Sequence, residues 1–325
     1  MRRLLITAAA ATTAALTLSA CGTTEPAADD AKKTTERITL TDATGVKVEL
    51  DGPAEKVVGT EWNVVEHLIT LGVDPVGVAD VKGYKTWDTA VPLKNEPKDI
   101  GTRGEPSVET VAGLKPDLIV ATTDLPPAAV KQLRKVAPVL TLKAADATDP
   151  IGRMNADLDA IAEATGTTQK AEELKKQFQA KLDEGRKALA DAGLAGTKYA
   201  FADGYVMSNQ VSIRPYTSGS LIGAVSEKLG LKNAWTVKGD PAYGLAATDV
   251  EGLTKLGDVQ FAYVGNDGDA ASTPFTGVLA KDKVWTSLPF VKKGDVHRLP
   301  DGIWMFGGPR SMGKYVDSVV AALTK

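Results

Sequence analysis

Few residues in this sequence are of a type and spacing that could perform catalysis. Ser220 stands in Gly219-Ser220-Leu221, which lacks the second glycine of the G-x-S-x-G turn that exposes a hydrolase nucleophile. His67 and His297 lie too far apart for an H-E-x-x-H metal motif. The single cysteine, Cys21, excludes an intramolecular disulfide and a site built from several thiolates. We therefore expect a binding protein rather than an enzyme, with a surface esterase or chelate reductase as the alternative.

One segment imitates a nucleotide-binding loop. Residues 308–314 match G-x-x-x-x-G-K, but Tyr315 stands where a serine or threonine hydroxyl must bind Mg²⁺. An aromatic loop at Trp304 precedes the segment, in place of a clear apolar strand. Nucleotide binding is therefore not expected, although the N–H groups of a helix start here could hold an anionic or oxygen-rich ligand.

The composition is that of an ordinary folded protein. The chain has 325 residues, of which 43% are hydrophobic and 24% charged, and this length fits two lobes better than one. Lys and Arg number 38 and Asp and Glu number 41, so the net charge is −3. Because affinity for nucleic acid depends on clustered basic residues, no nucleic-acid partner is expected.

The N-terminus indicates export. Arg2 and Arg3 precede an apolar run from Leu4 to Leu18, which is too short for a comfortable membrane span. Residues 1–20 are therefore expected to be a signal peptide. Leu18-Ser19-Ala20-Cys21 resembles a bacterial lipobox, which implies lipid on Cys21 and anchoring to the outer face of the cytoplasmic membrane; a buried core thiol is the alternative. Residues 21–36 then form a flexible tether.

The elements that must position any site follow a β/α alternation. Short β-branched runs and helix-period segments alternate between residues 57 and 140, after a small hairpin over residues 38–50. The alternation restarts after Gly196. We expect strands at 199–202, 261–264 and 296–299 and helices at 220–229 and 315–323. Such alternation predicts mostly parallel sheets with helices on their faces.

Two helices separate these halves. Residues 151–165 form one, and residues 168–192 form a longer one with a single apolar stripe through Ala171, Leu174, Phe178, Leu182 and Leu189. The longer helix is either an ordinary amphipathic helix of one domain or a rigid strut between two lobes. An echo between the halves, Val108-Glu109 in the first and Val250-Glu251 in the second, favours two related lobes.

Several segments together resemble one family, the substrate-binding lipoproteins of ABC importers for iron–siderophores, vitamin B12 and haem. The segments that carry the resemblance are Val57–Thr60, Leu71–Val78, Asp99–Glu109, Leu114–Ile119, Leu229–Trp235 and Trp285–Arg298. The likeness covers about residues 56–320. It implies the class III periplasmic-binding-protein fold, with two α/β lobes joined by one long helix. The lobes would be residues 37–166 and 196–325, and the joining helix would lie within 167–195.

The resemblance is strongest to the ferric hydroxamate branch, on the segment Gly101–Pro106. It implies a monomeric binding lipoprotein that captures a ferric siderophore between its lobes and delivers it to an ABC permease dimer with its ATPase. No intrinsic cofactor or metal is implied. A trishydroxamate surrounds Fe³⁺ with six oxygens, so the cleft needs aromatic walls and donors for the outward oxygens.

Mapped onto this chain, the resemblance makes Arg103 the arginine that reaches the hydroxamate oxygens. The other candidates for contact with the ligand are Tyr243, Trp304, Phe306, Trp62, Tyr84, Trp87, Arg214, Tyr216 and Arg310. Trp304 and Phe306 could equally belong to the core. Arg214 and Arg310 are extra positive charges that leave room for an anionic chelate such as ferric citrate. Haem, vitamin B12 and free ferric iron held by tyrosines are further alternatives.

The resemblance also assigns a docking role to two acids. Glu109 and Glu251 correspond to the acid at the tip of each lobe that pairs with arginines of the permease dimer. Two exposed acids on matched lobes would fix the orientation of the binding protein on the permease more than they would raise its affinity for the permease. The alternative for each is a solvated glutamate at a helix start.

Overall fold

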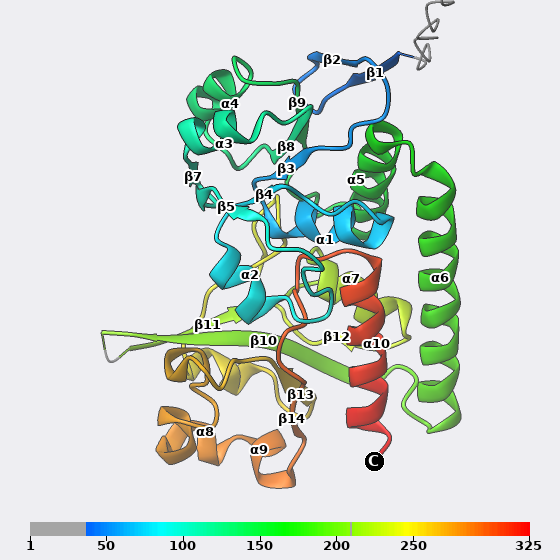
Figure 1. Cartoon of the computed structure of the whole chain (residues 1–325). Coiled ribbons are helices and arrows are strands. Elements are labelled where there is room, and N and C mark those ends of the chain that lie inside the picture. Colours follow the sequence, from blue (N-terminus) through cyan, green and yellow to red (C-terminus); the bar gives the residue numbers. More distant parts are fainter. Residues whose placement is uncertain (1–36, 209) are drawn as a thin grey trace, which may run out of the picture. The chain divides into compact units, whose positions relative to one another are not determined.

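Two sheets, one in each half of the chain, organise the fold (Figure 1). The computed structural model describes residues 37–208 and 210–325. The expected signal peptide, the lipid site at Cys21 and the tether lie outside the described residues. A two-stranded hairpin, β1 (Ile38–Thr41) and β2 (Lys47–Leu50), precedes the first sheet, as the sequence predicts.

The first sheet is entirely parallel and has the strand order β5-β4-β3-β8-β9. Its strands are β3 (Val57–Gly59), β4 (Gly77–Val78), β5 (Lys98–Asp99), β8 (Leu118–Thr122) and β9 (Val139–Leu142). The helices of this half are α1 (Trp62–Leu71), α2 (Val81–Trp87), α3 (Val108–Leu114), α4 (Pro127–Leu133) and α5 (Pro150–Thr165).

Both faces of this sheet are buried, which explains the continuous apolar runs of its strands. Val57 and Leu118 pack with α1 and α5 on one face, whereas Val58 and Ile119 pack with α3 and α4 on the other. This alternation follows from the two-residue period of a strand.

The second sheet has the order β11-β10-β13-β14, and β12 (Lys232–Asn233) also pairs with β10. Its other strands are β10 (Lys198–Met207), β11 (Gln210–Pro215), β13 (Gln260–Tyr263) and β14 (Val296–Arg298). Helices α7 (Leu221–Lys228) and α10 (Pro309–Leu323) cover one face, and α8 (Lys283–Ser287) and α9 (Pro289–Lys293) cover the other. Strand β11 is antiparallel to β10, so this sheet is mostly rather than wholly parallel.

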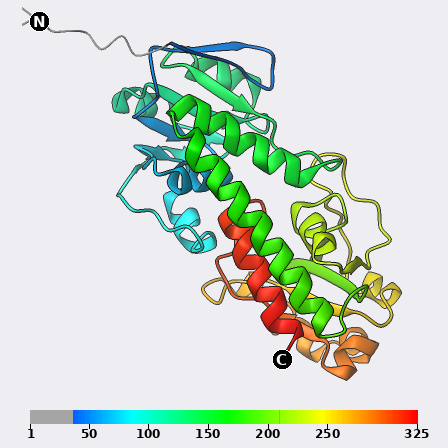
Figure 2. The same cartoon turned by 90° about the vertical axis from the view of Figure 1, so that its right-hand side faces the viewer.

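The long helix α6 (Thr168–Asp191) belongs to both halves (Figure 2). Ala171 and Leu174 are buried in the core of the first half, whereas Phe178, Leu182 and Leu189 are buried in the core of the second. Helix α6 packs so closely against α10 that a side chain at position 185 would clash. A Cβ at Gly185 would lie only 2.6 Å from Cγ1 of Val316. The strut interpretation of the apolar stripe is therefore correct. We call the two halves the N-lobe and the C-lobe; their exact boundaries at residues 166 and 196 stay a prediction.

The lobes are also connected by a buried carboxylate. Glu66 on α1 accepts hydrogen bonds at the start of α10, from Ser311 N at 3.0 Å and Ser311 Oγ at 2.8 Å. A carboxylate is favoured at this end of a helix by the unpaired N–H groups and the helix dipole. No Cβ fits at Gly307, where it would lie 2.1 Å from Oε2 of Glu66. The backbone contact from Ala90 N to Gly302 O, at 2.9 Å, joins the lobes beside this point.

The structure corrects three details of the expected elements. Strand β10 continues to Met207 and pairs with β11, which the sequence analysis did not predict although Val211 and Ile213 alternate with polar residues. Helix α10 begins at Pro309 rather than 315, since proline is favoured in a first helical turn and Met312 is buried.

None of the described helices, over residues 37–208 and 210–325, is long and apolar enough to cross a bilayer.

The carboxyl group of Asp88 gives the fold a testable pH dependence. Asp88 is fully buried, and burial together with the neighbouring Glu66 charge raises its pKa to about 10. The folded protein therefore keeps a proton on Asp88 that the unfolded chain releases near pH 4. Because the folded state binds more protons, stability falls as the pH rises between these values.

We expect the Asp88→Asn variant to lose less stability than the wild type as the pH rises. The window from pH 7.5 to pH 9.5 reports on Asp88 together with its neighbour Glu66, whose pKa burial also raises. Other buried groups change charge below this window, since burial lowers the pKa of His67 to about 4 and raises that of Asp157 to about 7. Over this window the wild-type protein should lose up to about 1.4 kcal/mol per pH unit more than the variant in urea unfolding. Equal slopes for the two proteins would contradict the assignment of a proton to Asp88.

Candidate ligand-binding cleft

Two adjoining cavities lie between the lobes, at the carboxyl ends of the N-lobe strands. We call them the first cavity, of about 330 Å³, and the second cavity, of about 440 Å³. Each is within the rough range of 300–1,000 Å³ of small-molecule sites. They share Arg103, Arg214 and Trp304, so these three side chains lie where the two cavities adjoin, and we call the two cavities together the cleft.

Arg103 reaches the cleft from a tight turn between two short strands, β6 (Gly101–Thr102) and β7 (Glu105–Pro106). Gly101 has a φ of +101°, which favours glycine at the start of this turn. The Arg103 guanidinium lies 4.4 Å from the ring centre of Trp62 and 5.2 Å from that of Trp304. Its Nε donates to Oε2 of Glu61 at 2.9 Å.

The terminal nitrogens of Arg103 remain available to a ligand. Among the described residues they make no hydrogen bond, and 36% of the side chain is exposed. Glu61 immediately precedes α1 and is itself mostly buried. Burial raises the pKa of Glu61, and the Arg103 charge opposes that shift. The pair therefore holds the guanidinium in a fixed orientation with its outer donors free.

Arg214 approaches the same point from the C-lobe. It stands opposite Asp203 in the β10–β11 ladder, and its Nε donates to Oδ1 of Asp203 at 2.9 Å. Tyr216 was expected to contact the ligand, but it is 1% exposed and lines neither cavity. Its hydroxyl instead lies 3.1 Å from Nη2 of Arg214 and 3.1 Å from Oδ2 of Asp203. Tyr216 therefore positions the Arg214 guanidinium from the core of the C-lobe.

A row of aromatic rings crosses from one lobe to the other. Trp62 of the N-lobe lies 4.8 Å from Trp304, Trp304 lies 5.2 Å from Phe306, and Phe306 lies 5.5 Å from Tyr243. All three contacts are edge-to-face, the arrangement that aromatic quadrupoles favour. The Trp62 indole donates to Ala79 O at 3.1 Å, which fixes the first ring of the row. Trp304, Phe306 and Tyr243 come from loops of the C-lobe, whereas Arg214, Tyr205 and Met207 come from strands β10 and β11.

The mouth of the first cavity is bridged by Tyr243 and Asp124. The Tyr243 hydroxyl donates to the Asp124 carboxylate, which follows strand β8 of the N-lobe. Burial, together with the Asp124 carboxylate, raises the pKa of Tyr243. Trp87, Tyr205 and Met207 line the second cavity at the other end of the cleft.

Besides Tyr216, two further predicted contacts are wrong. Tyr84 is completely buried in the N-lobe and donates to Val91 O at 2.6 Å, and it lines neither cavity of the cleft. Arg310 is exposed in the first turn of α10 and lines neither cavity of the cleft; its charge adds to that of Lys170, the main cause of the lowered pKa of Glu173 on α6. Both errors arise because sequence position near a strand end or loop does not fix the direction of a side chain. That the remaining candidates contact a ligand stays a prediction.

The sequence analysis missed the acids of the cleft. Glu61 follows β3 and Asp124 follows β8, and ligands gather at the carboxyl ends of parallel strands. That rule could have found both residues. Asp203 could be assigned to the cleft only once the pairing of β10 with β11 was known.

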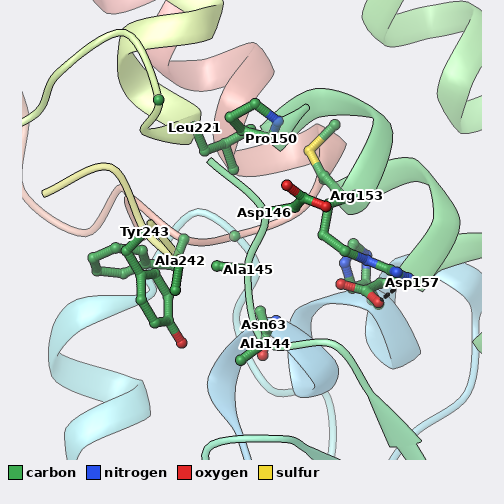
Figure 3. A pocket seen from close by; sticks show the side chains of 15 residues that line it. Asn63, Ala144, Ala145, Asp146, Pro150, Arg153, Asp157, Leu221, Ala242 and Tyr243 are labelled. Atoms are coloured by element: carbon green, nitrogen blue, oxygen red, sulfur yellow. Dashed lines mark hydrogen bonds and ion pairs between the residues drawn. The ribbon is translucent and has the colours of Figure 1, made fainter. Parts of the chain in front are cut away.

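A third, much smaller pocket lies behind Tyr243 (Figure 3). Its volume is about 50 Å³, which suits one or two waters rather than a chelate. Arg153 and Asp157 form an ion pair at 2.5 Å on one wall, and Asn63 lies on another. We therefore assign no ligand to this pocket.

The docking candidates are exposed on their respective lobes. Glu109 lies in the first turn of α3 in the N-lobe, and Glu251 begins a short 3₁₀ helix, Glu251–Lys255, in the C-lobe. Their pairing with a permease stays a prediction. Within residues 37–208 and 210–325, no three His, Cys, Asp or Glu side chains are arranged to hold a metal ion.

Comparison with solved structures defines the class of the protein. The Fe³⁺–Desferal-bound siderophore-binding protein FhuD from Vibrio cholerae superposes with a TM-score of 0.73 at 25% identity, covering 83% of this chain and 98% of that one. FeuA from Bacillus subtilis, complexed with ferri-bacillibactin, gives 0.70 at 19% identity over 88% of this chain and 98% of that one. The fold is that of a class III periplasmic binding protein, as the sequence predicts.

Comparison of sequences gives the family. The periplasmic binding protein family matches residues 57–302, and this chain belongs to it. The iron(3+)-hydroxamate-binding protein FhuD of Escherichia coli (strain K12) is 24% identical over 265 residues, 80% of this chain and 84% of that protein. The Fe(3+)-citrate-binding protein YfmC of Bacillus subtilis (strain 168) is 27% identical over 259 residues, 79% and 77% of the two chains. The family is one of binding proteins rather than enzymes.

Proposed function

We propose that this protein captures a ferric siderophore of the hydroxamate type between its lobes and delivers it to an ABC permease. The observation that carries the proposal is the Arg103 guanidinium, held by Glu61 and two indole rings with its outer donors directed at an open cleft. The similarity to hydroxamate-binding FhuD proteins supports the same ligand class.

The chemistry of the ligand fits these surroundings. Three hydroxamates supply all six oxygens that Fe³⁺ needs, so the protein has to recognise only the outside of the complex. Charge-assisted hydrogen bonds from Arg103 and Arg214 suit the outward oxygens, and the row from Trp62 to Tyr243 supplies rigid apolar faces. The iron is cargo and remains within its chelator.

Two alternatives find less support in the described residues. Ferric citrate is anionic, yet Arg214 is already paired with Asp203 and Arg310 lies outside the cleft. Direct capture of ferric iron by tyrosines is disfavoured because only Tyr205 and Tyr243 reach the cleft, at its opposite ends.

We further propose that the protein is exported and anchored through lipid on Cys21, with residues 21–36 as the tether. The N-terminal sequence supports this, and two curated relatives from Bacillus subtilis (strain 168) are named as lipoproteins. In this arrangement the lobes act as a monomer outside the cytoplasmic membrane. Glu109 and Glu251 would then contact the permease dimer.

Binding of the chelate should quench tryptophan fluorescence, because Trp62, Trp87 and Trp304 line the cleft. We expect saturable quenching by ferrioxamine B or ferrichrome at sub-micromolar concentration. Arg103→Ala should weaken binding about 10- to 100-fold through lost charge-assisted hydrogen bonds. Arg310→Ala is the matched control and should bind as the wild type does. The proposal fails if neither chelate quenches the wild type at about 10 µM.

The docking role predicts a loss of transport without a loss of binding. The double variant Glu109→Arg/Glu251→Arg should reduce uptake of radiolabelled ferric chelate by intact cells about tenfold, because like charges would then face each other at the permease. Chelate binding by the purified variant should be unchanged. Glu184→Arg, at an exposed position on α6, serves as the control. Normal uptake by the double variant would exclude these acids from docking.

A further inference from the structure

The two cavities of the cleft differ in chemistry. Trp87, Tyr205 and Met207 make the second cavity largely apolar on its outer side. The first cavity adds the carboxylates of Glu61 and Asp124 to the two arginines that both cavities share, and Asp124 is exposed. Since the two cavities adjoin at Arg103, Arg214 and Trp304, a chelate that occupied both would meet different surroundings at its two ends.

The charges of the cleft do not balance. Arg103 is paired with Glu61 at 2.9 Å, and Arg214 is paired with Asp203 across the β10–β11 ladder. Asp124 is left over, because its hydrogen-bond partner is the neutral hydroxyl of Tyr243 and it forms no ion pair among the described residues. Three carboxylates thus accompany two guanidiniums.

Asp124 is open to a ligand. It is exposed, and the Tyr243 hydroxyl occupies one of its two oxygens, Oδ2. A carboxylate can accept about four hydrogen bonds, so most of its capacity is unused. Glu61 lies close enough for the Asp124 charge to raise the pKa of Glu61 further, so the two acids lie on the same side of the first cavity.

We propose that the cleft selects ferric chelates that carry a cationic group, and that Asp124 receives this group at the mouth of the first cavity. The proposal rests on the proposed function and specifies its substrate class: a ferric trishydroxamate with a free ammonium. The iron–hydroxamate core then lies over Arg103 and Arg214. Its apolar linkers extend toward Trp87 and Met207 in the second cavity.

A matched series of chelates tests this selection. Ferrioxamine B ends in an ammonium group, its N-acetyl derivative ends in a neutral amide, and its N-succinyl derivative ends in a carboxylate, while the ferric core is the same in all three. At low salt we expect affinity to fall from the cationic to the neutral to the anionic chelate, by about tenfold over the series. The preference should shrink in 0.5 M NaCl, as screening requires.

Asp124→Asn should abolish the preference. We expect it to weaken binding of the cationic chelate about fivefold more than binding of the neutral chelate, and the neutral chelate also reports correct folding. Asp74→Asn is the matched control. It removes the same charge in the loop before β4, at the amino ends of the parallel N-lobe strands, and should behave as the wild type does.

The outcomes separate this inference from the proposed function. Equal binding of the three chelates, or tightest binding of the succinyl derivative, would overturn the selection for a cation while the proposed function stands. A preference that persists in Asp124→Asn would show that another group receives the ammonium, which also overturns the assignment. Failure of all three chelates to bind would overturn both.

Discussion

The contact on which the cleft depends is the Arg103 guanidinium, held between the rings of Trp62 and Trp304 and against the carboxylate of Glu61. Trp62 belongs to the N-lobe and Trp304 to the C-lobe, so the cation lies where the two lobes meet. Because Glu61 neutralises the charge and the rings restrict rotation, the outer donors are oriented before any ligand arrives. Such preorganisation reduces the entropic cost of binding.

The fold keeps this contact in register by joining the lobes at several points. Helix α6 contributes Leu174 to one core and Leu182 to the other, so the lobes cannot separate without exposing apolar surface. The buried Glu66 carboxylate holds the start of α10, the helix that follows the aromatic loop of Trp304. A stiff helix and a buried polar connection together favour a cleft formed largely in advance, with small movements on binding.

Most of the fold could be predicted from sequence, whereas the site could be predicted only in part. The periodicity of residues 168–192 and the β-branched runs are local signals, and they predicted the long helix and the β/α alternation, whereas the strut between two lobes came from the echo between the halves and from the family resemblance. Arg103 was found through a segment resemblance. The direction of a side chain depends on long-range packing, so Tyr84 and Arg310 were placed wrongly. Asp203 acquires its role only through a strand pairing that local patterns did not predict.

The most direct test of the central contact is the anomalous scattering of iron in a crystal of the protein with ferrioxamine B. The account predicts one iron site between the lobes, with six oxygen ligands from the chelator and hydroxamate oxygens within about 3 Å of the terminal nitrogens of Arg103. Iron bound directly by a protein oxygen would contradict it. So would a chelate seated outside the cleft, with Arg103 making no contact to it.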